Sequence, residues 1–462
     1  MKPRIYRLRE YQSIRANRDN EPFRHGEVDA AGHMVIDKNA FTKLVELVNE
    51  NKGTPKDLNA EPLELLSIAT RNKTKVITAR NFVGTISLGD GTVIEIIPKI
   101  VSDAGNDAEY ADAKKVLLNM LRTVFNISPK QFRMTDLEIR RLTILDIFIR
   151  MFVREVQAIV KRGLQSAYIA HSANEKFLKG RIDFASHIRM NIVRKDRIFC
   201  NYDLFHLNRP ENRLLKTALE LLLLKTNCDQ NHRDILLLLL AFDDVDKSPD
   251  IDTDFATVTL DRNMAHYDTA LRWCNVFLRN KSFMPLPGTK KTAAEKAYAL
   301  LYPMERLFES FVATYIRRGA KDSFTVEAPG KGSYLFDEPR RFEIRPDIVL
   351  SSGAPSNTIV IDTKWKMLSS ESLKNYGIAQ SDMYQMYAYQ KKYAAKKVIA
   401  IYPLSESSRY IDNAEFKSHH DHAHVSIRFA NLLHIEDSIG SILKECESTL
   451  FTDSPPVQTS AP

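Results

Sequence analysis

The chain has 462 residues, too many for a single hydrophobic core, and its length indicates two or three domains. Its composition, 44% hydrophobic and 27% charged, is that of a soluble globular protein and argues against a disordered or fibrous one. The formal net charge of +8 favours an anionic partner only weakly, because many basic proteins bind nothing anionic.

Membrane and secreted classes are also disfavoured. Residues 1–9 lack the apolar stretch of a secretory signal, and the longest apolar run, 235–242, is far too short to span a bilayer. The four cysteines are scattered without any Cys-x-x-Cys pair, which argues against zinc fingers and disulfide frameworks. We therefore expect a cytoplasmic protein with no membrane partner.

The first hundred residues are predicted to be rich in β-structure. Residues 81–88 and 92–100 are apolar, β-branched runs on either side of Gly89-Asp90-Gly91, a pattern typical of a β-hairpin. We expect a β-rich domain over residues 1–102, although residues 1–75 carry no motif that assigns them a role. The small and acidic residues 103–113 are typical of a linker.

Residues 114–280 are predicted to be mainly helical. Apolar residues between Leu142 and Val160 recur at helical spacing, and Gly163 stands where such a helix would stop. A short strand is expected over 178–184 and a further helix from Asn212. Between them lies a basic cluster of Arg189, Arg194, Lys195 and Arg197, which could follow a phosphate backbone or equally be an exposed face.

A third domain is expected over residues 292–453, after a boundary rich in proline and glycine at 281–291. It is predicted to begin with a helix near Ala293, interrupted or restarted at Pro303. Strands follow at 324–326, 342–350, 359–365 and 398–402, with a helix capped by Ser381 between the last two. This order predicts an α/β sheet flanked by helices. Residues 454–462 are expected to be a disordered tail.

Two acidic residues in this domain are predicted to face each other. The runs 345–350 and 359–365 form a hairpin about a turn at 351–358, and the register that pairs Leu350 with Ile359 also pairs Asp347 with Asp362. Lys364 lies on the same face as Asp362, because side chains alternate along a strand. Two opposed carboxylates among apolar neighbours are most simply compensated by a bound cation.

Such a site is suited to hydrolysis of a phosphodiester. Carboxylates select Mg²⁺, with Mn²⁺ as the substitute, and Lys364 could orient water or stabilise charge on phosphorus. The alternative to a catalytic site is that Asp362 and Lys364 belong to a surface Asp-x-Lys sequence and that Asp347 is an ordinary aspartate at the end of a strand. The functional interpretation is favoured because Asp362 interrupts an otherwise apolar strand. On the preceding helix, Glu305 or Glu309 could reach this end of the sheet.

Two further features have competing structural explanations. Gln385 and Tyr389 share one helical face, and the amide could support a metal site, but their spacing alone is better explained by packing. The histidines of 419–424 resemble a metal cluster, yet no partner lies at a familiar spacing, so a solvated loop is expected.

Taken together, the motifs resemble the PD-(D/E)xK nuclease superfamily and, more narrowly, the McrC family, the nuclease subunits of McrBC modification-dependent restriction systems. The resemblance runs in order from about residue 80 to about 405. It is carried by residues 82–84, 95–100, 178–182, 212–216, 308–312, 345–349, 361–366 and 382–389.

The resemblance implies a role for each site residue. Asp347 and Asp362 would be metal ligands, Glu309 a supporting acid and ligand, and Lys364 the catalytic lysine. Gln385 and Tyr389 would match a Gln-x-x-x-Tyr helix motif. The implied fold is multidomain α/β with a C-terminal PD-(D/E)xK domain.

The resemblance also implies the partners: DNA and a McrB-like hexameric AAA+ GTPase, which recognises methylated cytosine. The chain would bind this GTPase through its N-terminal domain, residues 1–102, and stimulate its GTP hydrolysis. The chain itself has no phosphate-binding Gly-x-x-x-x-Gly-Lys-Ser/Thr loop, so no nucleotide is expected on it. The alternatives are an adaptor that activates the GTPase without cutting, and a stand-alone repair or anti-phage nuclease.

Overall fold

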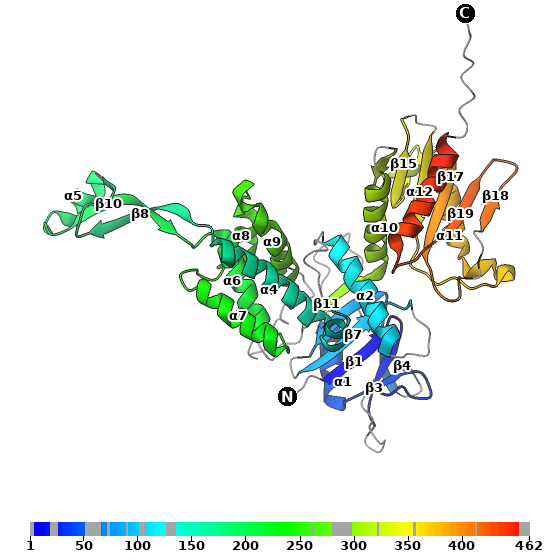
Figure 1. Cartoon of the computed structure of the whole chain (residues 1–462), viewed down its shortest axis with the longest axis horizontal. Helices are drawn as coiled ribbons and strands as arrows, with labels where there is room; N and C mark the ends of the chain where they lie inside the picture. The colour runs from blue at the N-terminus through cyan, green and yellow to red at the C-terminus, as the bar shows by residue number, and fades with distance from the viewer. Residues whose placement is uncertain are drawn as a thin grey trace, which may run out of the picture.

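The computed structural model describes residues 4–18, 26–50, 66–71, 74–88, 91–100, 107–125, 135–260, 262–279, 298–320, 323–353, 357–409, 411 and 414–451. Figure 1 shows a β-rich part near the N-terminus, a helical part with a projecting arm, and an α/β part that ends the chain. Over the described ranges, no helix is long and apolar enough to cross a membrane. The predicted boundary at 281–291 and the predicted tail at 454–462 lie outside these ranges.

The N-terminal part contains two four-stranded sheets. The first has the order β1-β7-β6-β11, formed by β1 (Arg4–Arg9), β7 (Thr92–Ile97), β6 (Phe82–Ser87) and β11 (Tyr298–Pro303). The second has the order β3-β2-β5-β4, formed by β3 (Met34–Ile36), β2 (Ser13–Ala16), β5 (Thr74–Ala79) and β4 (Leu66–Arg71), and it packs against α1 (Lys38–Glu50). The predicted hairpin is confirmed, since β6 and β7 pair antiparallel with Gly84 opposite Ile96.

The strand β11 corrects the predicted start of the last domain. Residues 298–303 are a strand that pairs antiparallel with β6, and α10 (Met304–Ala320) begins only after Pro303. Ala293 lies outside the described residues. Consecutive side chains Ala299, Leu300 and Leu301 are all buried, so the run has no polar face from which its period could be recognised. At Gly84, whose φ is +138°, an added Cβ would lie 1.9 Å from the carbonyl oxygen of Leu300, so only glycine permits this close pairing.

The predicted linker is also wrong in its second half. Residues 107–113 form the first two turns of α2 (Asp107–Val124), in which Ala111 and Ala113 are both buried, and α2 packs against α10. Glu95 of β7 holds this part together: it bonds the ammonium of Lys114 on α2 at 3.2 Å and accepts the backbone N–H of Ile144 at 2.6 Å.

The middle of the chain is largely helical, as predicted. Gly163, with φ +89°, ends α4, and the capping threonine at its start is Thr143. The predicted helix from Asn212 belongs to α6 and begins slightly earlier. The helices are α3 (Asp136–Arg141), α4 (Ile144–Arg162), α6 (Pro210–Leu223), α7 (Asp229–Ala241), α8 (Ile251–Thr257), η1 (Arg262–Tyr267), α9 (Asp268–Cys274) and η2 (Asn275–Arg279).

A three-stranded arm projects from these helices (Figure 1), and the sequence did not predict it as a unit. It has the order β8-β10-β9 and comprises β8 (Ala167–Glu175), β9 (Arg181–Ile182), α5 (Phe184–Asn191) and β10 (Ile198–His206). The expected strand over 178–184 is shorter than predicted, because Asp183 caps α5 by accepting the N–H of Ser186. Side chains near its tip are strongly exposed, including Phe177 (77%), Ile192 (74%) and Val193 (86%).

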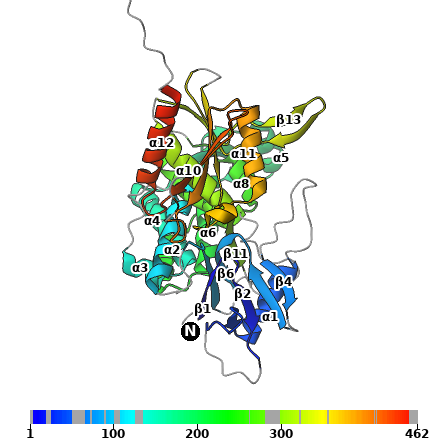
Figure 2. The same cartoon turned by 90° about the vertical axis from the view of Figure 1, so that its right-hand side faces the viewer.

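The C-terminal part is a mixed six-stranded sheet between helices, as predicted. Its order is β12-β15-β16-β17-β19-β18, with α10 and α12 on one face and α11 on the other (Figure 2). The bounds are β12 (Thr325–Glu327), β15 (Ile348–Ser351), β16 (Thr358–Thr363), β17 (Lys397–Pro403), β19 (His424–Ala430), β18 (Glu415–Lys417), η5 (Ser372–Gly377), α11 (Gln380–Lys392) and α12 (Ile435–Phe451).

Two details of this part differ from expectation. Residues 342–350 are not one strand: β14 (Arg340–Ile344) pairs with β13 (Ser333–Asp337) in a separate hairpin, and Pro346, which has no N–H for the ladder, lies before β15. Helix α11 begins at Gln380 with Ala379 as its cap, so Ser381 is inside it. The hydrophobic core is continuous from α2, α4, α6 and α9 through α10 to the sheet.

Candidate active site

The predicted hairpin register is confirmed. Strands β15 and β16 pair antiparallel with Leu350 opposite Ile359 and Ile348 opposite Ile361. One further step sets Asp347, the residue before β15, opposite Asp362. The Asp347 carboxylate is held in place by two hydrogen bonds at 2.6 Å, from the N–H and the hydroxyl of Thr363. The two acids therefore meet at the C-terminal end of β16, on the face covered by α11.

Asp362 is an electrostatically costly residue in this position. Its side chain is almost fully buried, and burial, followed by repulsion from Asp347, raises its pKa from an ordinary value near 3.8 to about 7. Lys364 Nζ lies 2.7 Å from Asp362 Oδ2 and opposes this shift by its charge and by a hydrogen bond. Apart from this ammonium, the buried Asp362 Oδ2 has no hydrogen-bond partner in the part of the chain that the structure describes.

Lys364 is oriented by a chain of hydrogen bonds from α11. Its ammonium donates to Gln385 Oε1 at 2.9 Å, Gln385 Nε2 bonds the Tyr389 hydroxyl at 2.8 Å, and that hydroxyl donates to the carbonyl of Arg345 at 2.9 Å. Burial alone would lower the pKa of Lys364, but Asp362 and Asp347 outweigh it and raise the pKa. Gln385 and Tyr389, whose spacing alone favoured packing, therefore contact the site.

Glu309 stands at the edge of the site. It is half-buried on α10, and burial together with the nearby Asp347 raises its pKa. Within the described ranges, no group of three or more histidine, cysteine or acidic residues is gathered closely enough to hold a metal. The structure therefore brings Asp347, Asp362 and Lys364 together and leaves Glu309 beside them.

The donor set still suits a hard cation. Mg²⁺ is commonly held by one or two carboxylates and completed by water and substrate phosphate, so two aspartates are enough. The pKa of Asp362 remains raised to about 7 although Lys364 lies against it, so a cation shared with Asp347 would stabilise the ionised form.

Sequence reasoning missed one residue that reaches this site. Glu10, from the segment that carried no motif, accepts a hydrogen bond from the indole of Trp365, directly after Lys364. Nothing local in the sequence identifies it, because 355 positions separate the two residues.

The other features singled out in the sequence lie elsewhere. Arg189, Arg194 and Lys195 are exposed on the arm, whereas Arg197 is half-buried and donates to the carbonyl of Asn174. His424 contacts Glu415 at 3.3 Å, and the histidine loop forms no metal cluster among the described residues.

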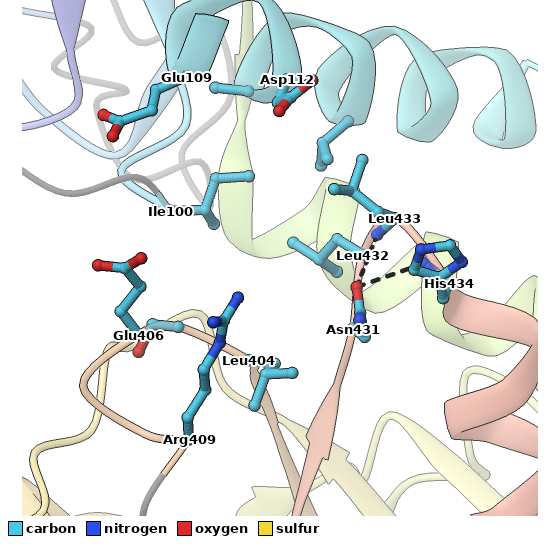
Figure 3. Close-up of a pocket in the computed structure, with 13 residues that line it drawn as sticks. Ile100, Glu109, Asp112, Leu404, Glu406, Arg409, Asn431, Leu432, Leu433 and His434 are labelled. Atoms are coloured by element: carbon cyan, nitrogen blue, oxygen red, sulfur yellow. Dashed lines mark hydrogen bonds between the residues drawn. The ribbon is translucent and has the colours of Figure 1, made fainter. Parts of the chain in front are cut away.

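A pocket of about 400 Å³ separates α2 from the C-terminal sheet (Figure 3). Glu109 and Asp112 of α2 line one side, and Glu406, Arg409 and the loop after β19 line the other. It contains none of the residues of the acid site.

Comparisons with known proteins are consistent with one another. The family model described as "McrBC 5-methylcytosine restriction system component" matches residues 77–403, more than half of the chain. The Escherichia coli (strain K12) protein described as type IV methyl-directed restriction enzyme EcoKMcrBC is 21% identical over 262 residues, covering 53% of this chain and 71% of that protein.

One solved structure shows a similar fold over nearly the whole chain. A chain of the half-complex from the tetradecameric assembly of Thermococcus gammatolerans McrB AAA+ hexamers with bound McrC is 16% identical, with a TM-score of 0.69, covering 96% of this chain and 99% of that one. A chain of the T. gammatolerans McrBC complex is 18% identical with a TM-score of 0.48, covering 69% and 88%.

Proposed function

The chain belongs to the McrBC 5-methylcytosine restriction system component family, and from this we propose that it is the metal-dependent DNA endonuclease subunit of such a system. One observation carries the proposal: the buried Asp362 carboxylate, opposed by Asp347, lies 2.7 Å from the ammonium of Lys364, and its pKa is still raised to about 7. This arrangement is costly for stability and is explained by a cation and an anionic substrate. We assign this arrangement of Asp347, Asp362 and Lys364 to the PD-(D/E)xK type of nuclease site.

Asp347 and Asp362 would hold the metal, Mg²⁺ or Mn²⁺. Bound there, it would polarise a phosphoryl oxygen and lower the pKa of a coordinated water. Thr363 fixes the orientation of Asp347 by its two hydrogen bonds. Glu309, half-buried with a raised pKa, is close enough to influence the charge of the site and would support it through water.

Lys364 supplies positive charge where the transition state becomes more negative. Its raised pKa keeps the ammonium protonated at neutral pH, so it can donate to a phosphate oxygen or orient the attacking water. Gln385 holds the ammonium, and Tyr389 in turn holds Gln385 against the carbonyl of Arg345. This chain of bonds reduces the freedom of Lys364 before substrate arrives.

The partner is a McrB-like AAA+ GTPase hexamer, and DNA is the substrate. A chain with the same fold comes from an assembly whose name includes McrB AAA+ hexamers with bound McrC. The projecting arm supports a partner surface here, because it combines exposed apolar side chains such as Val193 with exposed basic ones such as Arg194. GTP binding and the choice of methylated target belong to the partner.

A non-cleaving activator of the GTPase is the second candidate. The observation that favours it is that Asp362 already pairs with the ammonium of Lys364 at 2.7 Å, so its charge has a partner without any metal. This candidate predicts full GTPase stimulation and no DNA cleavage under any metal condition.

The test compares wild type, Asp362→Ala and Asp337→Asn, a control whose carboxylate is exposed on β13 of the same domain. Each is incubated with the GTPase partner, GTP and Mg²⁺ on methylated and unmethylated plasmid. We expect wild type and Asp337→Asn to cut methylated plasmid and Asp362→Ala to stimulate GTP hydrolysis without cutting. If Asp362→Ala still cuts plasmid, the acid site is not the catalytic site. If wild type stimulates GTP hydrolysis but never cuts DNA, the chain is a non-cleaving activator of the GTPase.

A further inference from the structure

A buried hydrogen bond joins the N-terminal sheet to the strand end that carries the site. Trp365 Nε1 donates to the Glu10 carboxylate, 3.2 Å from Oε1 and 3.0 Å from Oε2. Both side chains are buried, with Glu10 2% and Trp365 7% exposed. Glu10 directly follows β1. Two hydrogen bonds connect it to the end of the neighbouring strand β7: its N–H donates to the carbonyl of Ile97, and its carboxylate accepts the N–H of Lys99.

Trp365 stands between two elements of the site. It follows Lys364 in the chain, and its ring packs against Phe308 with centroids 5.3 Å apart. Phe308 precedes Glu309 on α10, and α10 itself continues directly from β11 of the N-terminal sheet. A displacement of the indole would therefore move the backbone of Lys364 and disturb the helix that carries Glu309.

An ionised carboxylate at position 10 is destabilised by its burial. Burial raises the pKa of Glu10 to about 7, and the nearby charge of Glu305 on α10 adds to the shift, while Lys99 and the indole N–H oppose it. Burial, followed by the charges of Glu10 and Glu305, raises the pKa of Tyr11, the next residue. A neutral amide oxygen at this position could also accept the indole N–H, so the contact with Trp365 depends on an acceptor at position 10 and not on its charge.

We propose that Glu10 is a positioning residue of the nuclease site: by holding the Trp365 indole, the N-terminal sheet sets the position of Lys364. The inference rests on the proposed function for its effect on cleavage, but the geometric link stands independently. The N-terminal segment thus has a role in the site: a displacement of Glu10 would change the position of Lys364 through the hydrogen bond to Trp365.

The test measures Lys364 directly. The full chain is treated with an amine-acylating reagent, and mass spectrometry follows the acylation rates of Lys364 and of Lys247, which pairs with Glu220 in the helical part and serves as internal reference. In Glu10→Ala, Lys364 should react several-fold faster while Lys247 is unchanged. Glu10→Gln, whose amide oxygen can still accept the indole N–H, should largely restore the wild-type rate. Glu46→Ala, an exposed carboxylate on α1, should have no effect.

Cleavage provides the second measurement. With the partner present, Glu10→Ala should lower kcat about 10- to 100-fold at unchanged KM for DNA, since a displacement near 1 Å has effects of this size. Trp365→Phe keeps the ring packing and should match Glu10→Ala, and the double variant should be no worse than either. Unchanged acylation of Lys364 in Glu10→Ala and Trp365→Phe overturns the inference, even if cleavage falls. If Glu10→Ala changes the acylation rate of Lys364 but the wild-type protein never cuts DNA, the link between Glu10 and Lys364 is upheld and the proposed nuclease function is rejected.

Discussion

Replacing Asp362 by asparagine should stabilise the metal-free protein while abolishing DNA cleavage. A carboxylate whose pKa rises from 3.8 to about 7 on folding is less stable in its ionised form in the folded protein. Because each pKa unit corresponds to about 1.36 kcal/mol, the penalty for the ionised form approaches about 4 kcal/mol. Asparagine has nearly the same volume and no charge, although it still buries a polar group, so we expect a net gain of about 2–4 kcal/mol at pH 8.

The sign of the pH dependence is a second check on the same substitution. The folded protein binds the Asp362 proton more tightly than the unfolded chain does, so this residue destabilises wild type progressively as pH rises from about 4 to about 7. The advantage of Asp362→Asn should therefore be larger at pH 8 than at pH 5 by about 2–3 kcal/mol.

The assay is urea unfolding followed by circular dichroism in EDTA, with plasmid cleavage measured in parallel. Adding Mg²⁺ should stabilise wild type and leave Asp362→Asn unchanged, because a ligand that binds only the folded site adds to stability. A variant no more stable than wild type at pH 8 in EDTA would show that Lys364 already compensates the carboxylate. That result would refute the electrostatic reason for placing a cation here.

The remaining predictions concern three other parts of the chain. Lys364→Met should reduce kcat at least about 100-fold in plasmid cleavage, whereas Lys366→Met, at the same strand end, should stay within about threefold of wild type. Lys114→Met leaves the Glu95 carboxylate buried without its cation and should cost about 3–5 kcal/mol in urea unfolding; a loss below about 1 kcal/mol would contradict the assigned role of the pair. Val193→Asp on the arm should leave the melting temperature unchanged but weaken binding to the GTPase partner about tenfold or more, measured by surface plasmon resonance, and undiminished affinity would exclude the arm tip from the interface.

The acid pair was predictable because its determinants are local. A turn of small and polar residues fixes the hairpin, and alternation along each strand then fixes which side chains face each other, so the amino-acid sequence alone pairs Asp347 with Asp362. The same reasoning located the hairpin of β6 and β7 and the end of α4 at Gly163. Each of these features depends on residues close together in the chain.

Spacing along a helix was less informative. It placed Gln385 and Tyr389 on one face, but a face can point to core, solvent or site, and only the packing of α11 against β16 and β17 directs Gln385 to Lys364. The position of Glu309 is a similar case, because its distance from the aspartates depends on how α10 lies on the sheet.

Other features had no signal in the sequence at all. The run 298–303 is apolar on both faces, so nothing in it indicates a strand that returns to the N-terminal sheet. The hydrogen bond from Trp365 to Glu10 joins residues 355 positions apart, and no residue pattern near either one indicates that they are in contact.

The sequence by itself determined the chemistry of this protein: two opposed aspartates and a lysine on adjacent strands, set by turn residues and by the two-residue period of a strand. Only the tertiary structure decided what surrounds that chemistry. Burial of Asp362, orientation of Lys364 by α11, and the contact with Glu10 arise where segments distant in the chain pack together. Those contacts depend on the whole fold, and no local pattern of residues encodes them.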